Sequence, residues 1–303
     1  MNPGIRGLPT QFSQMPQGLL GAPTPIPMPD QYWHYEAIDW ANRASANGGT
    51  ISTTVLRAVS DFCAAADLGQ FRSAIYRLNL FAGGNLSGCL VPLYRGPTFG
   101  GATFGNSRDT NVNFVSGDYS ETGAIGGLKG NGTNKYLNTG LALNAFPSVT
   151  SIHQSASATS ASTGGNFIFS GTRNIVTAES FVLDEFTQAS NGRAYRCGTG
   201  TVGQFPVVTS PGATEAHFIG NRESSTSVTL YRNGVSVATN ATSITTTAHA
   251  IPFTVFACNG PSSGVIGLSA SRMRMYSIGT SVRAAQAAAF SAAVIAFNTA
   301  LGR

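Results

Sequence analysis

The sequence predicts a mainly β protein: an antiparallel β-sandwich that follows an extended proline-rich arm and a small helical module, and that ends in a helix. Two observations carry this prediction. From Asn113 onward, about a dozen short apolar runs alternate with turn residues, which is typical of two packed antiparallel sheets. Residues 227–239 contain the clearest pair of runs, on either side of Asn233-Gly234. This dipeptide accepts the positive φ angles of a tight hairpin turn.

We expect one face of this hairpin to be buried, because apolar residues alternate along both of its strands. They are Val228, Leu230, Val235 and Val237.

Composition limits the classes of function. Only 10% of the 303 residues are charged, and glycine contributes 36 residues, while 42% are hydrophobic. This is a folded chain with a polar, weakly charged surface. The net charge is +5, but the basic residues are scattered singly, so we do not expect a nucleic-acid partner. We also expect no signal peptide and no membrane span.

The four cysteines, Cys63, Cys89, Cys197 and Cys258, lie far apart and lack the spacing of metal ligands. Each lies in or beside an apolar run, so we expect buried free thiols.

Residues 1–30 form the predicted arm. Seven prolines exclude a helix and leave an extended chain. The segment has more apolar residues than a linker needs, so we expect it to anchor the protein on a partner. The expected anchoring residues are Ile5, Leu8, Phe12, Leu19, Leu20 and Ile26.

Helical periodicity begins at residue 31. A first short helix is predicted to end at the turn residues 47–49, and a second, capped by Thr50 or Ser52, to carry an apolar stripe from Val55 to Cys63. Residues 31–97 are thus predicted to form the helical module. Residues 98–112, which are rich in Gly, Thr and Asn, are predicted to be a linker, and residues 113–303 the sandwich.

The chain is predicted to end in a helix over residues 281–302. Four apolar residues, Phe290, Val294, Phe297 and Leu301, recur there at helical spacing between alanines. This stripe is expected to pack on a sheet or on a partner helix.

The later part of the chain carries a family likeness. The runs 217–222, 229–235, 253–257 and 273–279 together resemble the second half of concanavalin A-like (laminin G-like) jelly-roll domains. The likeness extends from Asn113 to the C-terminus. It implies a jelly-roll topology for the sandwich.

Three other runs, 77–83, 90–93 and 126–133, are similar to stretches of phage and prophage proteins in which a helical module precedes such a sandwich. That resemblance implies a non-enzymatic virion structural protein: a decoration, head-fibre or tail-appendage subunit. It would be assembled in the host cytoplasm, bind other capsid or tail proteins through its arm, form a homo-oligomer and be exposed on the particle. The alternative is a carbohydrate- or receptor-binding adhesin that recognises a host surface glycan.

A glycan hydrolase is a weaker alternative. Jelly-roll enzymes that cleave β-glucans alternate two Glu and an Asp along one strand, so that acid and nucleophile face the groove together. Here Glu179 and Glu185 are six residues apart, and Asp184 adjoins Glu185. The signature is absent, and we expect no catalytic residue. Glu215 and His217 share a face if they lie on one strand, but no nucleophile accompanies them.

No cofactor is expected, although laminin G-like domains often bind calcium or sugar at one rim. The acids that would ligate calcium are Asp109, Asp118 and Asp184. The rings that would stack on a sugar are Tyr119, Tyr136 and Tyr195.

Overall fold

We analysed a computed structural model, which describes residues 33–159, 166–174, 179–186, 192–199, 207–209, 215–241, 243, 247–260 and 264–303. The arm predicted for residues 1–30, with its six anchoring residues, lies outside the described residues. The chain from Trp33 to Arg303 forms one compact unit.

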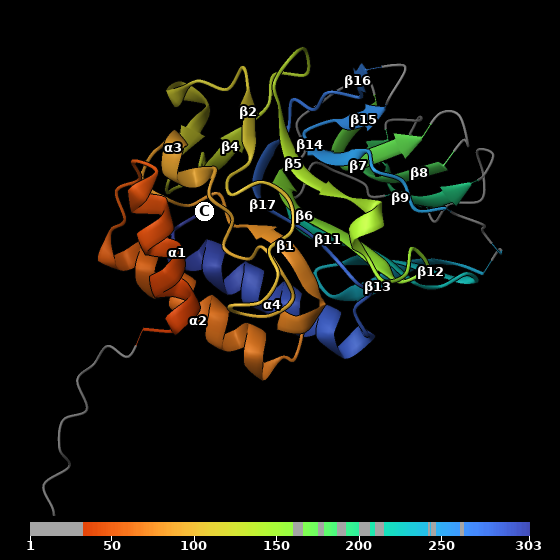
Figure 1. The fold of residues 1–303 in the computed structure, drawn as a ribbon, viewed down its shortest axis with the longest axis horizontal. Helices are drawn as coiled ribbons and strands as arrows, with labels where there is room; N and C mark the ends of the chain where they lie inside the picture. The colour runs from red at the N-terminus through yellow and green to blue at the C-terminus, as the bar shows by residue number, and fades with distance from the viewer. Residues whose placement is uncertain are drawn as a thin grey trace, which may run out of the picture. The chain divides into compact units, whose positions relative to one another are not determined.

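Three layers make up this unit: two mainly antiparallel sheets packed face to face, and a layer of helices on the outer face of one of them (Figure 1). The two sheets and the C-terminal helix confirm the predicted fold class. The helices are α1 (Tyr35–Ala46), α2 (Thr53–Leu68), α3 (Leu86–Cys89) and α4 (Ala284–Ala300). None of the described helices combines the length and apolarity needed to cross a bilayer.

Sheet A, which carries the helices, has the strand order β13-β12-β11-β6-β17-β4-β3, and β1 also pairs with β17. Its strands are β1 (Ile75–Asn79), β3 (Tyr119–Ser120), β4 (Gly127–Lys129), β6 (Ile152–Thr159), β11 (Ala216–Ser224), β12 (Ser227–Arg232), β13 (Val235–Asn240) and β17 (Arg272–Gly279).

Sheet B has the order β10-β9-β8-β7-β14-β5-β2, with β15 paired in parallel to β7 and β16 paired antiparallel to β15. Its strands are β2 (Thr110–Val112), β5 (Tyr136–Ala142), β7 (Asn166–Asn174), β8 (Glu179–Phe186), β9 (Gly192–Thr199), β10 (Val207–Thr209), β14 (Pro252–Val255), β15 (Cys258–Gly260) and β16 (Gly264–Ile266).

Alternation along the strands of sheet A divides the hydrophobic core in two. Phe218 and Tyr276 face sheet B, whereas their neighbours Ile219 and Met275 face the helices. The second core includes all four residues of the predicted stripe on α4, and Phe290 stacks on Phe71 with ring centroids 4.8 Å apart.

The helical segment and the sandwich share this second core. Strand β1 pairs with β17 across nearly 200 residues of sequence, so the boundary predicted at residue 97 falls inside the compact unit. The predicted linker is also more ordered than its composition indicates, because Thr110–Val112 forms β2 against β5 and Asp109 is fully buried.

Local chemistry explains where the elements begin and turn. Ser52 caps α2 by accepting a hydrogen bond from the backbone N–H of Val55. Asn233 and Gly234 both have positive φ and form the predicted hairpin turn between β12 and β13. The expectation that Val235 and Val237 are buried is wrong: β13 is an edge strand of sheet A, and both side chains are exposed.

Three cysteines among the described residues, Cys63, Cys89 and Cys258, are buried free thiols, as expected. The side chain of Cys197 lies outside the described residues.

Candidate ligand-binding site

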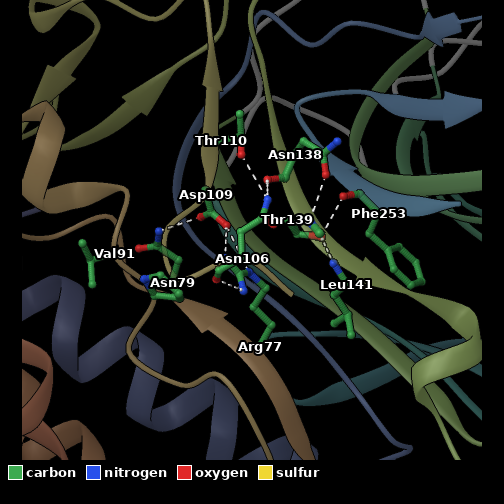
Figure 2. Close-up of polar contacts among 12 residues, drawn as sticks. Arg77, Asn79, Val91, Asn106, Asp109, Thr110, Asn138, Thr139, Leu141 and Phe253 are labelled. Carbon is green, nitrogen blue, oxygen red and sulfur yellow. Dashed lines mark hydrogen bonds and ion pairs between the residues drawn. The ribbon is translucent and has the colours of Figure 1, made fainter. Parts of the chain in front are cut away.

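Asp109, one of the three predicted calcium ligands, belongs to a buried polar cluster (Figure 2). Its Oδ1 accepts hydrogen bonds from Arg77 Nη2 at 2.7 Å and from the Tyr276 hydroxyl at 2.7 Å, and its Oδ2 accepts one from Asn79 Nδ2 at 2.9 Å. Neither Arg77 nor Asp109 is exposed to solvent. Both carboxylate oxygens thus already have partners within the protein.

The other two predicted ligands lie elsewhere in the fold. Asp118 precedes β3 and forms an ion pair with Lys135 at 2.6 Å. Asp184 is buried on β8 of sheet B. The three acids do not form a cluster, and a calcium site built from them remains a prediction.

Among the described residues, one group of three ligand-type side chains lies close together: His34, Glu36 and Cys63, with ligand atoms within 4.8 Å of one another. Arg72 donates to both carboxylate oxygens of Glu36, and the side chain of His34 interacts with Asp67 and with the backbone N–H of Glu36. Burial raises the pKa of the Cys63 thiol to about 12. Because both carboxylate oxygens of Glu36 are bound to Arg72 and the imidazole of His34 is bound to Asp67, this group does not fit a metal site.

The predicted sugar-stacking tyrosines are also spread over the fold. Tyr119 on β3 and Tyr136 on β5 are half-buried and pack against the core between the sheets, and the Tyr119 hydroxyl bonds to Glu121. Tyr195 lies on β9, and its side chain lies outside the described part of the chain. Among the described side chains, the rings of Tyr119 and Tyr136 do not contact each other, although their neighbours Asp118 and Lys135 form an ion pair.

Strand β8 carries the acids of the weaker hydrolase alternative. Glu179 and Glu185 lie at its opposite ends, paired with Asn174 and Phe167 of β7. Six residues of extended strand span about 20 Å, whereas glycosidase carboxylates lie roughly 5–10 Å apart. This pair therefore lacks the geometry for glycoside hydrolysis.

The geometry points instead to a site that the sequence did not reveal, between α1 and the loop of residues 93–103. Two adjoining cavities of about 190 and 570 Å³ share Glu36, Arg72, Thr98 and Phe99 as lining residues. We call them together the α1 cavity. Two side chains of α1 hold the start of this loop: Trp40 Nε1 donates to the carbonyl of Val91, and Arg43 donates to the carbonyls of Pro92 and Leu93.

Two ion pairs order the polar wall of the α1 cavity. Arg72 binds Glu36 and lies over the ring of Tyr94, with its guanidinium carbon 3.8 Å from the ring centroid. Arg43 binds Asp39 one helical turn away, at 2.7 Å.

Arg95 is the remaining guanidinium of this wall, and its side chain has no ion pair or hydrogen bond with any residue that the structure describes. It is half-buried. Burial, and secondly the charge of Arg43, lower the pKa of Arg95, because two positive charges face one wall. Asp39 and Asp67 also line the α1 cavity, and the charge of Asp39 opposes the shift. The guanidinium of Arg95, which pairs with no described carboxylate, can therefore bind an anionic group.

Two aromatic rings stand at the mouth of the α1 cavity. Tyr35 and Phe99 are about half-exposed, and their rings meet edge to face with centroids 4.7 Å apart. His34 stacks on Tyr35. Exposed rings beside charged planar groups form a surface on which a sugar ring can stack while its polar substituents are bound.

Sequence reasoning missed this site because its parts come from separate segments with no common motif. The available signal was the sequence 94–101, in which an aromatic, an arginine and another aromatic lie among glycines.

No protein family profile and no curated protein matches this sequence. Among solved structures, the chain is similar to the receptor-binding domain of a botulinum neurotoxin C/D mosaic serotype, with 8% identity over 70% of this chain and 49% of that one and a TM-score of 0.47. It is similar to the botulinum neurotoxin type G receptor-binding domain, with 8% identity over 71% and 50% of the two chains and a TM-score of 0.40.

Domains LG4-5 of the mouse laminin alpha1 chain are also similar, with 12% identity over 50% of this chain and 38% of that one and a TM-score of 0.33. The chain thus spans about half or less of the length of each of these three structures. Similarity at this level assigns no partner or activity to this chain.

Proposed function

We propose that the protein is a non-enzymatic carbohydrate-binding module and that the α1 cavity binds a saccharide bearing an acidic group. One observation carries the proposal: the guanidinium of Arg95, without an ion pair among the described residues, lies in the same cavity as the exposed rings of Tyr35 and Phe99.

Each part of the α1 cavity matches a feature of such a ligand. An arginine binds a carboxylate through two parallel, charge-assisted hydrogen bonds. An exposed aromatic ring covers the apolar face of a sugar ring. Asp39 and Glu36, both held by arginines, present further acceptors toward hydroxyl groups.

A glycan array tests this proposal. The full-length protein is expected to bind acidic glycans in preference to neutral ones, and Phe99→Ala and Arg95→Gln are each expected to weaken the signal. Val115→Ala is the matched control, because Val115 is 59% exposed and does not line the α1 cavity. Binding that survives both cavity substitutions would exclude this site.

We also propose that the protein is a structural subunit of a bacteriophage particle, anchored through residues 1–30. The proline-rich composition and apolar residues of that segment and the resemblance of residues 77–83, 90–93 and 126–133 to phage proteins support this role. Deleting residues 1–30 is expected to abolish incorporation into particles while the remaining chain stays folded. Normal incorporation of the truncated protein would contradict the anchoring role.

A second function, proposed for the exposed side of α1 and α2, is attachment to another protein of the particle. It is favoured by two exposed apolar side chains, Ile38 on α1 and Leu68 at the end of α2, which are 43% and 87% exposed. Replacing both with Asp separates the two functions. If this face attaches the protein, incorporation is lost while glycan binding by the purified protein persists; unchanged incorporation excludes attachment through these residues.

A further inference from the structure

A separate cavity of about 300 Å³ lies between the C-terminal half of α4 and the outer face of sheet A. We call it the α4 cavity. The residues that bear on its chemistry are Ser157, Glu215, His217, Ile295, Asn298, Thr299 and Arg303. Its volume is at the lower end of the range for small-molecule pockets, and it shares no lining residue with the α1 cavity.

Two buried side chains of the α4 cavity each have one polar atom without a partner among the described residues: His217 Nε2 and Asn298 Oδ1. The residues are 1% and 5% exposed. Their other polar atoms are held in place, because His217 Nδ1 bonds to Ser291 Oγ at 2.9 Å and Asn298 Nδ2 donates to Ser157 Oγ at 3.1 Å. A buried polar atom without a hydrogen-bond partner destabilises the folded protein. A bound molecule that forms hydrogen bonds with both atoms is therefore favoured.

Sheet geometry brings these groups to one place. His217 on β11 and Ser157 on β6 are directly opposed in the antiparallel pairing, so both face α4. The alanines of α4 let the helix approach this polar patch closely. The side chains that carry the two unpartnered atoms thus belong to the lining of one cavity.

The charge and polarity of the α4 cavity define its ligand. Burial lowers the pKa of His217 to about 3, so the imidazole is neutral at physiological pH. Glu215 forms an ion pair with Arg274. Arg303, the other charged residue of the lining, donates its guanidinium hydrogens to the backbone carbonyls of Glu121, Leu80 and Phe81, so each charged side chain of the lining already has partners. Asn298 Oδ1 and the Glu215 carboxylate accept hydrogen bonds, while Ile295 contributes an apolar wall.

We propose that the α4 cavity binds an uncharged, hydroxylated molecule of about the size of a monosaccharide or polyol. Its hydroxyl groups donate to Asn298 Oδ1 and to Glu215, and one of them pairs with His217 Nε2. This site does not depend on the function proposed for the α1 cavity, since it needs neither an acidic ligand nor Arg95.

The test is a titration of the full-length protein with free glucose, galactose, mannose, N-acetylglucosamine and glycerol, followed by ligand-detected NMR and calorimetry. Saturable binding of at least one probe at millimolar affinity is expected. Asn298→Leu and Glu215→Gln are each expected to weaken it about tenfold, the effect of losing roughly one hydrogen bond.

Thr299→Val is the matched control, because Thr299 lines the α4 cavity but its hydroxyl already donates to the carbonyl of Ile295; its affinity is expected to stay within about twofold of the wild-type value. Glu215→Gln keeps the test decisive if Asn298→Leu fails to fold. The proposal is overturned if no probe saturates, which means that water alone satisfies the two atoms, or if neither cavity substitution changes the affinity.

Discussion

The guanidinium of Arg77 and the carboxylate of Asp109 form an ion pair at 2.7 Å with neither side chain exposed to solvent. Arg77 belongs to β1 and Asp109 immediately precedes β2, so the pair connects sheet A with sheet B. Tyr276 of β17 and Asn79 of β1 complete its hydrogen bonds. A buried ion pair of this kind is stable only when both charges are present.

Removing one partner of this ion pair is therefore expected to destabilise the fold. Asp109→Ala leaves the Arg77 charge buried and uncompensated, and we expect a loss of about 3–5 kcal/mol in the free energy of unfolding. Urea denaturation measures this. Asp118→Ala is the control, because both side chains of its ion pair with Lys135 are 16% exposed, so a smaller loss is expected. Equal losses in the two variants would contradict this account.

The hairpin turn between β12 and β13 packs against α4. Gly234 has φ +82°, and a Cβ added there would lie 2.7 Å from Ala288 Cα. Gly234→Ala is expected to lower the melting temperature through both backbone strain and this clash. Gly123→Ala separates the two effects, because Gly123 has φ +77° but no atom within 4 Å of the added Cβ. We expect the melting temperature to fall further in Gly234→Ala than in Gly123→Ala; equal falls would show that the clash with α4 contributes nothing.

Two buried histidines make the protein sensitive to acid. Burial lowers the pKa of His153 to about 4, although a hydrogen bond to the Thr280 carbonyl opposes the shift, and burial lowers that of His217 to about 3. In the unfolded chain both have a pKa near 6.5. Above pH 6.5 both histidines are neutral in the folded and in the unfolded protein. Below it, protons bind the unfolded chain first, so stability falls as the pH falls toward 4.

As the pH falls from 6.5 toward 4, each histidine lowers the free energy of unfolding by on the order of 1 kcal/mol per pH unit. The free energy of unfolding, measured between pH 7 and pH 5, is expected to fall less steeply in His217→Asn than in the wild-type protein, whatever the variant's absolute stability. Parallel pH dependences would show that His217 does not drive the acid sensitivity.

Local patterns predicted most single elements of the fold. The Asn233-Gly234 turn, the cap at Ser52 and the stripe on α4 each depend on a few neighbouring residues. The pairing of β1 with β17 depends on residues nearly 200 positions apart, so no local pattern indicated that the helical segment shares a core with the sandwich. The exposure of Val235 likewise depends on the order of strands within sheet A.

The candidate sites were harder to predict, because acids and aromatic rings have structural as well as functional uses. Asp109 is bound by Arg77 and Tyr276, and the ring of Tyr119 packs against the core. The side chains at the α1 cavity come from α1, the end of α2 and the segment between α2 and β1, and the loop of residues 93–103. Only the fold shows that Arg95 lacks an ion pair among the described residues and lies in the same cavity as Phe99.

The most direct test of the central claim is the dissociation constant of an acidic glycan selected on the array, measured by calorimetry for wild type, Arg95→Gln and Arg108→Gln. Arg108 is exposed and does not line the α1 cavity. Arg95→Gln loses a charge-assisted hydrogen bond, so its dissociation constant is expected to be at least about tenfold higher than that of wild type. Arg108→Gln is expected to keep the wild-type constant. For the same glycan with its acid converted to an amide, Arg95→Gln is expected to have no effect. Equal affinity of wild type and Arg95→Gln for the acidic glycan would contradict the claim.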